Sequence, residues 1–141
     1  MKKIERNYYG WDITVVGKKF NDRFQVRCVP NMNYIYQLIQ NELYPYLATK
    51  YAEQNNLSTE LERDIDIIRK WTDNSIQEFI EDISTMEINF HRDFPFSLFC
   101  SLEERINEVM KYVKKDMKDT TPLSYYKVLQ DDERFDYRIK I

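Results

Sequence analysis

The chain has 141 residues, of which 43% are hydrophobic and 32% charged, and its formal net charge is −3. This balance is typical of a folded globular protein and excludes an intrinsically disordered chain. Its apolar stretches are all shorter than the roughly 20 residues of a membrane-spanning helix. No apolar segment follows Lys2 and Lys3, so we expect no signal peptide, no membrane association and a cytoplasmic location.

A β-hairpin is predicted near the start of the chain. Residues 1–9 are polar and then aromatic, and we expect them to be frayed. Apolar and polar residues alternate over residues 11–15 and again over residues 24–29, which is the period of a half-buried strand. The glycine, asparagine and aspartate within residues 17–22 favour a turn between these two strands. Pro30 should close the hairpin.

Two helices are predicted after the hairpin. Residues 31–55 carry apolar residues at helical spacing, and Pro45 inside this pattern should make the helix kink or restart. Residues 58–83 predict a longer amphipathic helix, for which Ser58 or Thr59 is the expected N-cap. Its apolar stripe consists of Leu61, Ile65, Ile68, Thr72, Ile76, Phe79 and Ile83. We expect this helix to be the spine of the fold.

A third strand and a third helix follow. Residues 86–91 alternate again, and the aromatic loop 92–96 contains a proline that cannot continue a central strand. Ser101 and Glu104 have the spacing of a capping box, which predicts the start of a helix. The apolar stripe of this helix consists of Leu102, Ile106, Val109, Val113 and Met117.

The last part of the chain leaves one assignment open. Residues 120–122 should end the third helix, because they include a proline. Residues 123–129 predict either a strand, which we prefer, or a short helix that begins at Thr121 and Pro122. Residues 134–141 alternate cleanly and predict an edge strand with charged residues on its solvent side.

These elements predict a single domain over residues 1–141 with an α+β fold. Its antiparallel sheet should contain about four or five strands, with three helices packed on one face. The predicted order of elements is ββααβα(β)β.

The composition excludes several kinds of catalytic site. Gly10 and Gly17 are the only glycines, so the chain has neither a P-loop nor a dinucleotide-binding glycine motif. The single histidine and the two cysteines, Cys28 and Cys100, lack the spacing of a metal site. We therefore expect no metal and no cofactor, and we interpret both cysteines as reduced, buried thiols.

An enzyme is the weakest of three functional hypotheses. His91 and Cys100 lie nine positions apart around the aromatic loop, so a base and a nucleophile could meet in space. No oxyanion or orienting signature accompanies them, and we predict that the protein is not an enzyme.

A second hypothesis is a nucleotide-binding or single-stranded nucleic-acid-binding module. Residues 1–30 hold seven basic and three acidic residues, and the predicted hairpin combines positive charge with an aromatic ring. The residues expected to bind are Trp11, Lys18, Lys19, Arg23 and Arg27. The acidic balance of the whole chain weighs against this hypothesis.

The leading hypothesis is an interaction protein that binds and blocks, or neutralises, a partner protein. Aromatic residues make up 15% of the chain, and eleven of them are tyrosines, which are favoured at protein interfaces. Many residues have A/T-rich codons, which favours a low-GC bacterial or phage genome as the origin. A small, acidic, glycine-poor and tyrosine-rich chain without a catalytic signature would fit an immunity protein for a toxin or a phage-encoded inhibitor of a host system. The surplus of aromatic residues would also suit a homodimer.

The expected partner is a nucleic-acid-processing enzyme with a basic surface. Residues 61–90 hold eight acidic and three basic residues, and acidic side chains facing a basic partner mainly raise the rate of association. The residues expected to contact the partner are Asp66, Asp73 and Glu81 as charges and Phe94 and Phe96 as loop anchors.

Overall fold

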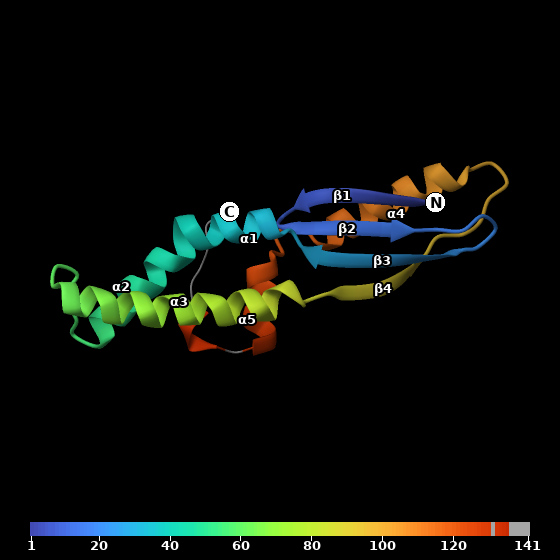
Figure 1. The fold of residues 1–141 in the computed structure, drawn as a ribbon. Coiled ribbons are helices and arrows are strands. Elements are labelled where there is room, and N and C mark those ends of the chain that lie inside the picture. Colours follow the sequence, from blue (N-terminus) through green and yellow to red (C-terminus); the bar gives the residue numbers. More distant parts are fainter. Residues whose placement is uncertain (131, 136–141) are drawn as a thin grey trace. The chain divides into compact units, whose positions relative to one another are not determined.

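The computed structural model describes residues 1–130 and 132–135, which form a four-stranded antiparallel sheet and several helices (Figure 1). The α+β class predicted from the sequence is confirmed, whereas the exact order of elements is not. The chain divides into two compact units, which we call the sheet unit (residues 1–31 and 86–125) and the helical unit (residues 32–85 and the chain from 126 onward). That the whole chain is a single domain stays a prediction.

The sheet contains four strands in the order β1-β2-β3-β4, all antiparallel to their neighbours. The strands are β1 (Lys2–Tyr8), β2 (Trp11–Val16), β3 (Arg23–Pro30) and β4 (Ile88–Asp93). Strands β2 and β3 form the predicted hairpin, and their burial alternates residue by residue as the sequence pattern requires. Strand β4 confirms the strand predicted around residues 86–91.

The first residues of the chain form an edge strand, so the prediction of a frayed start is wrong. Strand β1 pairs with β2 from Lys2, opposite Val16, to Glu5, opposite Ile13, and a bulge interrupts the pairing between Glu5 and Tyr8. Polar residues dominate β1 because an edge strand keeps much of its surface in water. Because β1 is mostly polar, the hydrophobic pattern of the sequence did not predict it.

Helix α4 (Leu102–Asp116) packs on one face of the sheet and completes the core of the sheet unit. Ser101 is its N-cap, and the Ser101 side chain accepts a hydrogen bond from the Glu104 backbone N–H at 3.1 Å, as the capping pattern predicts. The buried members of this core are Trp11, Ile13, Val15, Phe24, Val26, Cys28, Ile106, Val109, Met110, Val113 and Met117. The β3 residues that alternate with this core, Arg23, Gln25 and Arg27, are exposed, and we call their side the open face of the sheet.

The predicted interruption at Pro45 is realised by a change of helix type. Helix α1 (Met32–Leu38) continues into a π-helical segment (Ile39–Leu43) and then into α2 (Tyr44–Gln54), where Pro45 lies in the first turn. Proline has no N–H to donate and crowds the preceding turn, and the helix changes type directly before it, where the Tyr44 N–H donates to the Ile39 carbonyl five residues back. The restart at this position is therefore confirmed.

Helix α3 (Glu62–Ser84) is the predicted long helix, and most of its apolar stripe is buried. Its predicted side-chain cap at Ser58 or Thr59 is wrong, because the N-cap is Leu61, which makes no side-chain hydrogen bond. The buried carboxylate of Asp64 instead accepts a hydrogen bond from the Ser58 backbone N–H at 2.8 Å. Within the described residues, no helix has both the length and the apolar character that crossing a bilayer requires.

Residues 123–129 lie within helix α5 (Pro122–Gln130), so the preferred prediction of a strand is wrong and the alternative is confirmed. Thr121 and Ser124 cap this helix reciprocally, because the backbone N–H of each donates to the side-chain oxygen of the other. A short 3-10 helix (Glu133–Phe135) contains the first two residues of the strand predicted at 134–141, and residues 136–141 lie outside the described residues.

Gly17 lies where a strand end meets the core, and it tolerates no side chain. An added Cβ would collide with the Phe24 ring and lie 3.2 Å from a methyl carbon of Leu102. We therefore predict that Gly17→Ala lowers the free energy of unfolding by about 1–3 kcal/mol, which is the usual effect of overpacking. Urea denaturation would measure it, with Lys18→Ala as the control. A change below about 0.5 kcal/mol in Gly17→Ala would contradict this packing.

Candidate interaction surface

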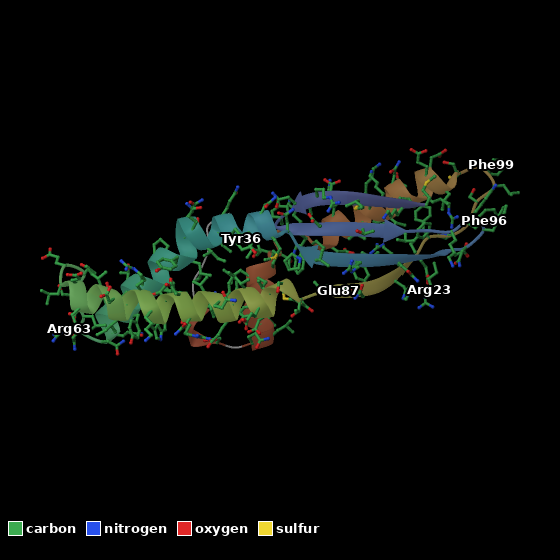
Figure 2. All side chains as sticks on the ribbon, in the orientation of Figure 1. Arg23, Tyr36, Arg63, Glu87, Phe96 and Phe99 are labelled. Atoms are coloured by element: carbon green, nitrogen blue, oxygen red, sulfur yellow. The ribbon has the colours of Figure 1, made fainter. Side chains whose placement is uncertain are left out.

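Two loops at one end of the sheet unit expose a group of large apolar side chains. The β2–β3 turn contributes Phe20, and the loop between β4 and α4 contributes Phe96, Leu98 and Phe99. Their exposed fractions are 69%, 38%, 85% and 95%. Figure 2 shows Phe96 and Phe99 at this end of the sheet unit. We call these four residues the apolar tip, because large exposed apolar side chains on two joined loops make a candidate interaction site.

Hydrogen bonds hold the two loops of the apolar tip together. The carboxylate of Asp22 accepts from the Phe96 backbone N–H at 2.7 Å, and the Asp22 carbonyl accepts from the Phe94 N–H at 2.8 Å. The rings of Phe20 and Phe96 pack edge to face with their centroids 5.4 Å apart. The apolar tip is thus a joined structure rather than two independent loops.

Arg105 is the buried residue that anchors both loops from below. It lies on α4, only 1% of it is exposed, and one of its terminal nitrogens donates to the carbonyls of Asn21 (2.8 Å) and Phe94 (3.0 Å). Its guanidinium also lies over the rings of Phe24 and Phe96, at 5.1 and 5.5 Å from their centroids. The nearest carboxylate in an ion pair with it, that of Asp22, is 3.7 Å away.

Phe20 holds a strained backbone conformation. Its φ angle is 67°, in the left-handed region that bulky residues rarely occupy. Placing a non-glycine residue there costs roughly 1–2 kcal/mol, and glycine would avoid this cost. Strain of this kind persists where the surrounding structure imposes it, and it gathers at functional positions.

The two aromatic anchors predicted from the sequence differ in their accessibility. Phe96 is exposed as predicted, whereas Phe94 is half-buried and packs against the core of the sheet unit. Sequence reasoning missed Phe20, Leu98 and Phe99. Leu98 and Phe99 form an apolar pair between the end of a strand and the N-cap of a helix. At this position neither the strand period nor the helix period predicts a buried face, and this was the signal that could have found them.

The three predicted acidic contacts all lie on the exposed surface of α3, in the helical unit. Asp66 pairs with Arg69 at 3.7 Å, Asp73 accepts a hydrogen bond from the Tyr44 hydroxyl at 3.1 Å, and Glu81 accepts one from the Gln77 amide at 3.2 Å. The three acidic residues therefore lie on one helix of the helical unit, whereas the apolar tip belongs to the sheet unit.

The residues predicted to bind nucleic acid differ in whether the structure leaves them accessible. Trp11 is fully buried, and its indole N–H donates to the Thr120 carbonyl at 2.8 Å, so its ring is not available for stacking on a base. Arg27 donates to Glu87 through two nitrogens, at 2.7 and 3.2 Å, and this interaction lowers the pKa of the Glu87 carboxyl. Lys18, Lys19 and Arg23 are exposed in or beside the β2–β3 turn.

His91 and Cys100 line different hollows of the sheet unit. His91 is exposed on β4, next to Gln25 of β3. Cys100 borders the cleft described next, and it is exposed, so the prediction that both cysteines are buried is wrong for Cys100. Cys28 is buried, and its burial raises the pKa of the thiol to about 11. No hydrogen bond joins His91 to Cys100 in the described structure.

A cleft of about 600 Å³ lies in the sheet unit beside β1 and α4. Its charged side chains are mixed in sign. Lys111 pairs with Glu108 at 3.0 Å and Lys114 with Glu5 at 3.4 Å, whereas Lys3 donates a hydrogen bond to the neutral amide of Asn107 at 2.9 Å. The charges of Lys111 and Lys114 are therefore each offset by a neighbouring carboxylate.

Comparisons with protein-family models, with curated proteins and with solved structures give no match to this chain.

The role of Arg105 leads to a stability prediction. Arg105→Met keeps most of the side-chain volume but leaves the carbonyls of Asn21 and Phe94 without their donor. We predict a loss of about 2 kcal/mol in the free energy of unfolding, because two partly buried carbonyls lose their shared charged donor and a hydrogen bond to a charged group contributes about 1.5–3 kcal/mol. Urea denaturation would measure it.

The matched control is Arg92→Met, which removes a partly exposed arginine paired with Asp116 at 2.8 Å. Surface ion pairs contribute about 0–1 kcal/mol, so this variant should remain close to the wild type. Equal losses in the two variants would contradict the anchoring role of Arg105.

Proposed function

We propose that this protein binds a partner protein through the apolar tip and thereby blocks or neutralises that partner. The single observation that carries the proposal is the exposure of Leu98 and Phe99, at 85% and 95%, on a loop that is tied to the fold. Large apolar side chains in water are unfavourable by themselves, and a partner's pocket would bury them.

The tied loops favour recognition of a protein surface. Binding requires that flexible groups become ordered, and this ordering subtracts from affinity. Hydrogen bonds from Arg105, together with those that Asp22 accepts, order the loops before any partner arrives. Aromatic side chains presented in this way are the residues that dominate binding energy at protein interfaces.

The acidic residues of α3 supply the second part of the proposal. Asp66, Asp73 and Glu81 are exposed, and each already has an intramolecular partner. Their contribution would therefore be long-range attraction of a basic partner, such as a nucleic-acid-processing enzyme, rather than new close contacts. Attraction of this kind raises the association rate and weakens with salt.

The apolar tip can be tested by removing its most exposed side chains. We predict that the double variant Leu98→Ser, Phe99→Ser changes the free energy of unfolding by less than about 0.5 kcal/mol, because both residues contact mainly water. It should weaken partner binding by at least about tenfold. Tagged protein purified from cells of its own source, followed by native mass spectrometry, would report the retained partner.

Tyr36→Ser is the control, because Tyr36 is 52% exposed and lies in the helical unit. A second variant, Phe20→Gly, removes a ring while relieving the backbone strain at this position. It should keep the stability of the wild type and lose affinity. If the wild type, the double variant, Tyr36→Ser and Phe20→Gly all retained the partner equally, the apolar tip would be excluded as the binding surface.

The acidic contribution has its own test. Replacing Asp66, Asp73 and Glu81 with lysine should lower the association rate and reduce its dependence on salt, with little effect on the dissociation rate. Surface plasmon resonance with the identified partner at two salt concentrations would measure both rates. An unchanged association rate with unchanged salt dependence would show that these acids take no part.

A further inference from the structure

A small hollow on the open face of the sheet unit gathers basic and amide side chains. Its volume is about 110 Å³, and it is lined by Val16, Lys18, Asn21, Arg23, Gln25 and His91. It lies beside the β2–β3 turn, and Figure 2 shows Arg23 near this end of the sheet. The mechanism proposed for the apolar tip uses none of these side chains.

Strand register explains why these residues meet. Val16 pairs with Gln25, and Gln25 pairs with His91, so the three form one row across β2, β3 and β4. Side chains two positions apart on a strand share a face, which places Arg23 beside this row. Asn21 accepts a hydrogen bond from the Arg23 backbone N–H at 2.9 Å, and this bond fixes the start of the strand.

The cations of this hollow lack the carboxylate partners that the protein provides elsewhere. Among residues 1–130 and 132–135, Arg23 is the one arginine without an ion pair to an acidic side chain. The side chains of Lys18 and His91 likewise make no hydrogen bond or ion pair with the described residues. Arg27, two residues along the same strand, is fully engaged by Glu87.

The acidic residues near the hollow form no ion pair with its cations. The carboxylate of Asp22 is held by the Phe96 N–H and faces Arg105. Asp93 lies opposite Arg23 in the strand register, but the two side chains form no ion pair. Lys18 and Arg23 therefore provide two charges that remain available to a ligand.

We propose that this hollow binds a single phosphate group. Arginine, lysine, histidine and the amides of asparagine and glutamine all offer N–H donors, and arginine matches the geometry of phosphate oxygens. Two permanent positive charges suit a phosphate dianion better than a monoanionic carboxylate. This inference is independent of the apolar tip, because it shares none of the residues that form the tip.

The test is a titration of the full ¹⁵N-labelled protein with inorganic phosphate, followed by NMR at constant ionic strength. Shifts should be confined to residues 16–25 and to the neighbourhood of His91. Arg23→Ala should weaken phosphate binding by about tenfold or more, because a hydrogen bond between charged groups is lost. Arg27→Ala, the matched control on the same strand, should leave binding unchanged.

Asp93→Asn should strengthen phosphate binding, because it removes the carboxylate that lies opposite Arg23 in the strand register. A nucleoside 5′-monophosphate that binds more tightly than inorganic phosphate would identify the source of the group as a nucleotide, and equal affinities would identify free phosphate. The unphosphorylated nucleoside should cause no shifts. Shifts spread over all surface lysines, or equal binding by Arg23→Ala and Arg27→Ala, would overturn the proposal.

Discussion

The burial of one arginine is the constraint on which the candidate surface depends. Arg105 reaches from α4 to the carbonyls of Asn21 and Phe94, which lie in different loops. A buried cation is expensive unless it is hydrogen-bonded, and here the carbonyls and the faces of Phe24 and Phe96 provide its surroundings. Because the arginine cannot leave without exposing these groups, the two loops stay joined.

The apolar tip combines two features that lower stability. Phe20 has a φ of 67°, and Leu98 and Phe99 are almost fully exposed apolar residues. None of these three side chains is part of the core of α4 and the sheet. Proteins accept such features where function requires them, because most positions could be replaced by more stable alternatives.

Hydrophobic periodicity and capping predicted the regular parts of the fold. The alternation over residues 11–15 and 24–29, the stripe of α3 and the Ser101 cap were each read from local patterns and are confirmed. Strand β1 was not predicted, because this edge strand lacks the apolar alternation from which strands are recognised. Helix α5 was only the second choice, because its cap uses Thr121 and Ser124, a pair of small hydroxyl residues without the usual glutamate.

The candidate site was predictable only in part, for a different reason. Phe96 could be identified because Pro95 cannot continue a central strand and so predicts an aromatic loop at this position. Arg105 could not, because nothing in its sequence neighbourhood distinguishes a buried arginine from the exposed ones that helices usually carry. The meeting of Val16, Gln25 and His91 depends on strand register, which local sequence does not specify.

The central claim is that the apolar tip contacts a partner protein, and site-specific photocrosslinking tests it most directly. A photoreactive phenylalanine analogue would be placed at Phe99 and, in a separate protein, at Tyr36, and both would be irradiated in cells of the protein's own source. Our account predicts one discrete protein adduct from position 99 and none of that mass from position 36. Adducts from position 36 alone, or none from position 99, would contradict it.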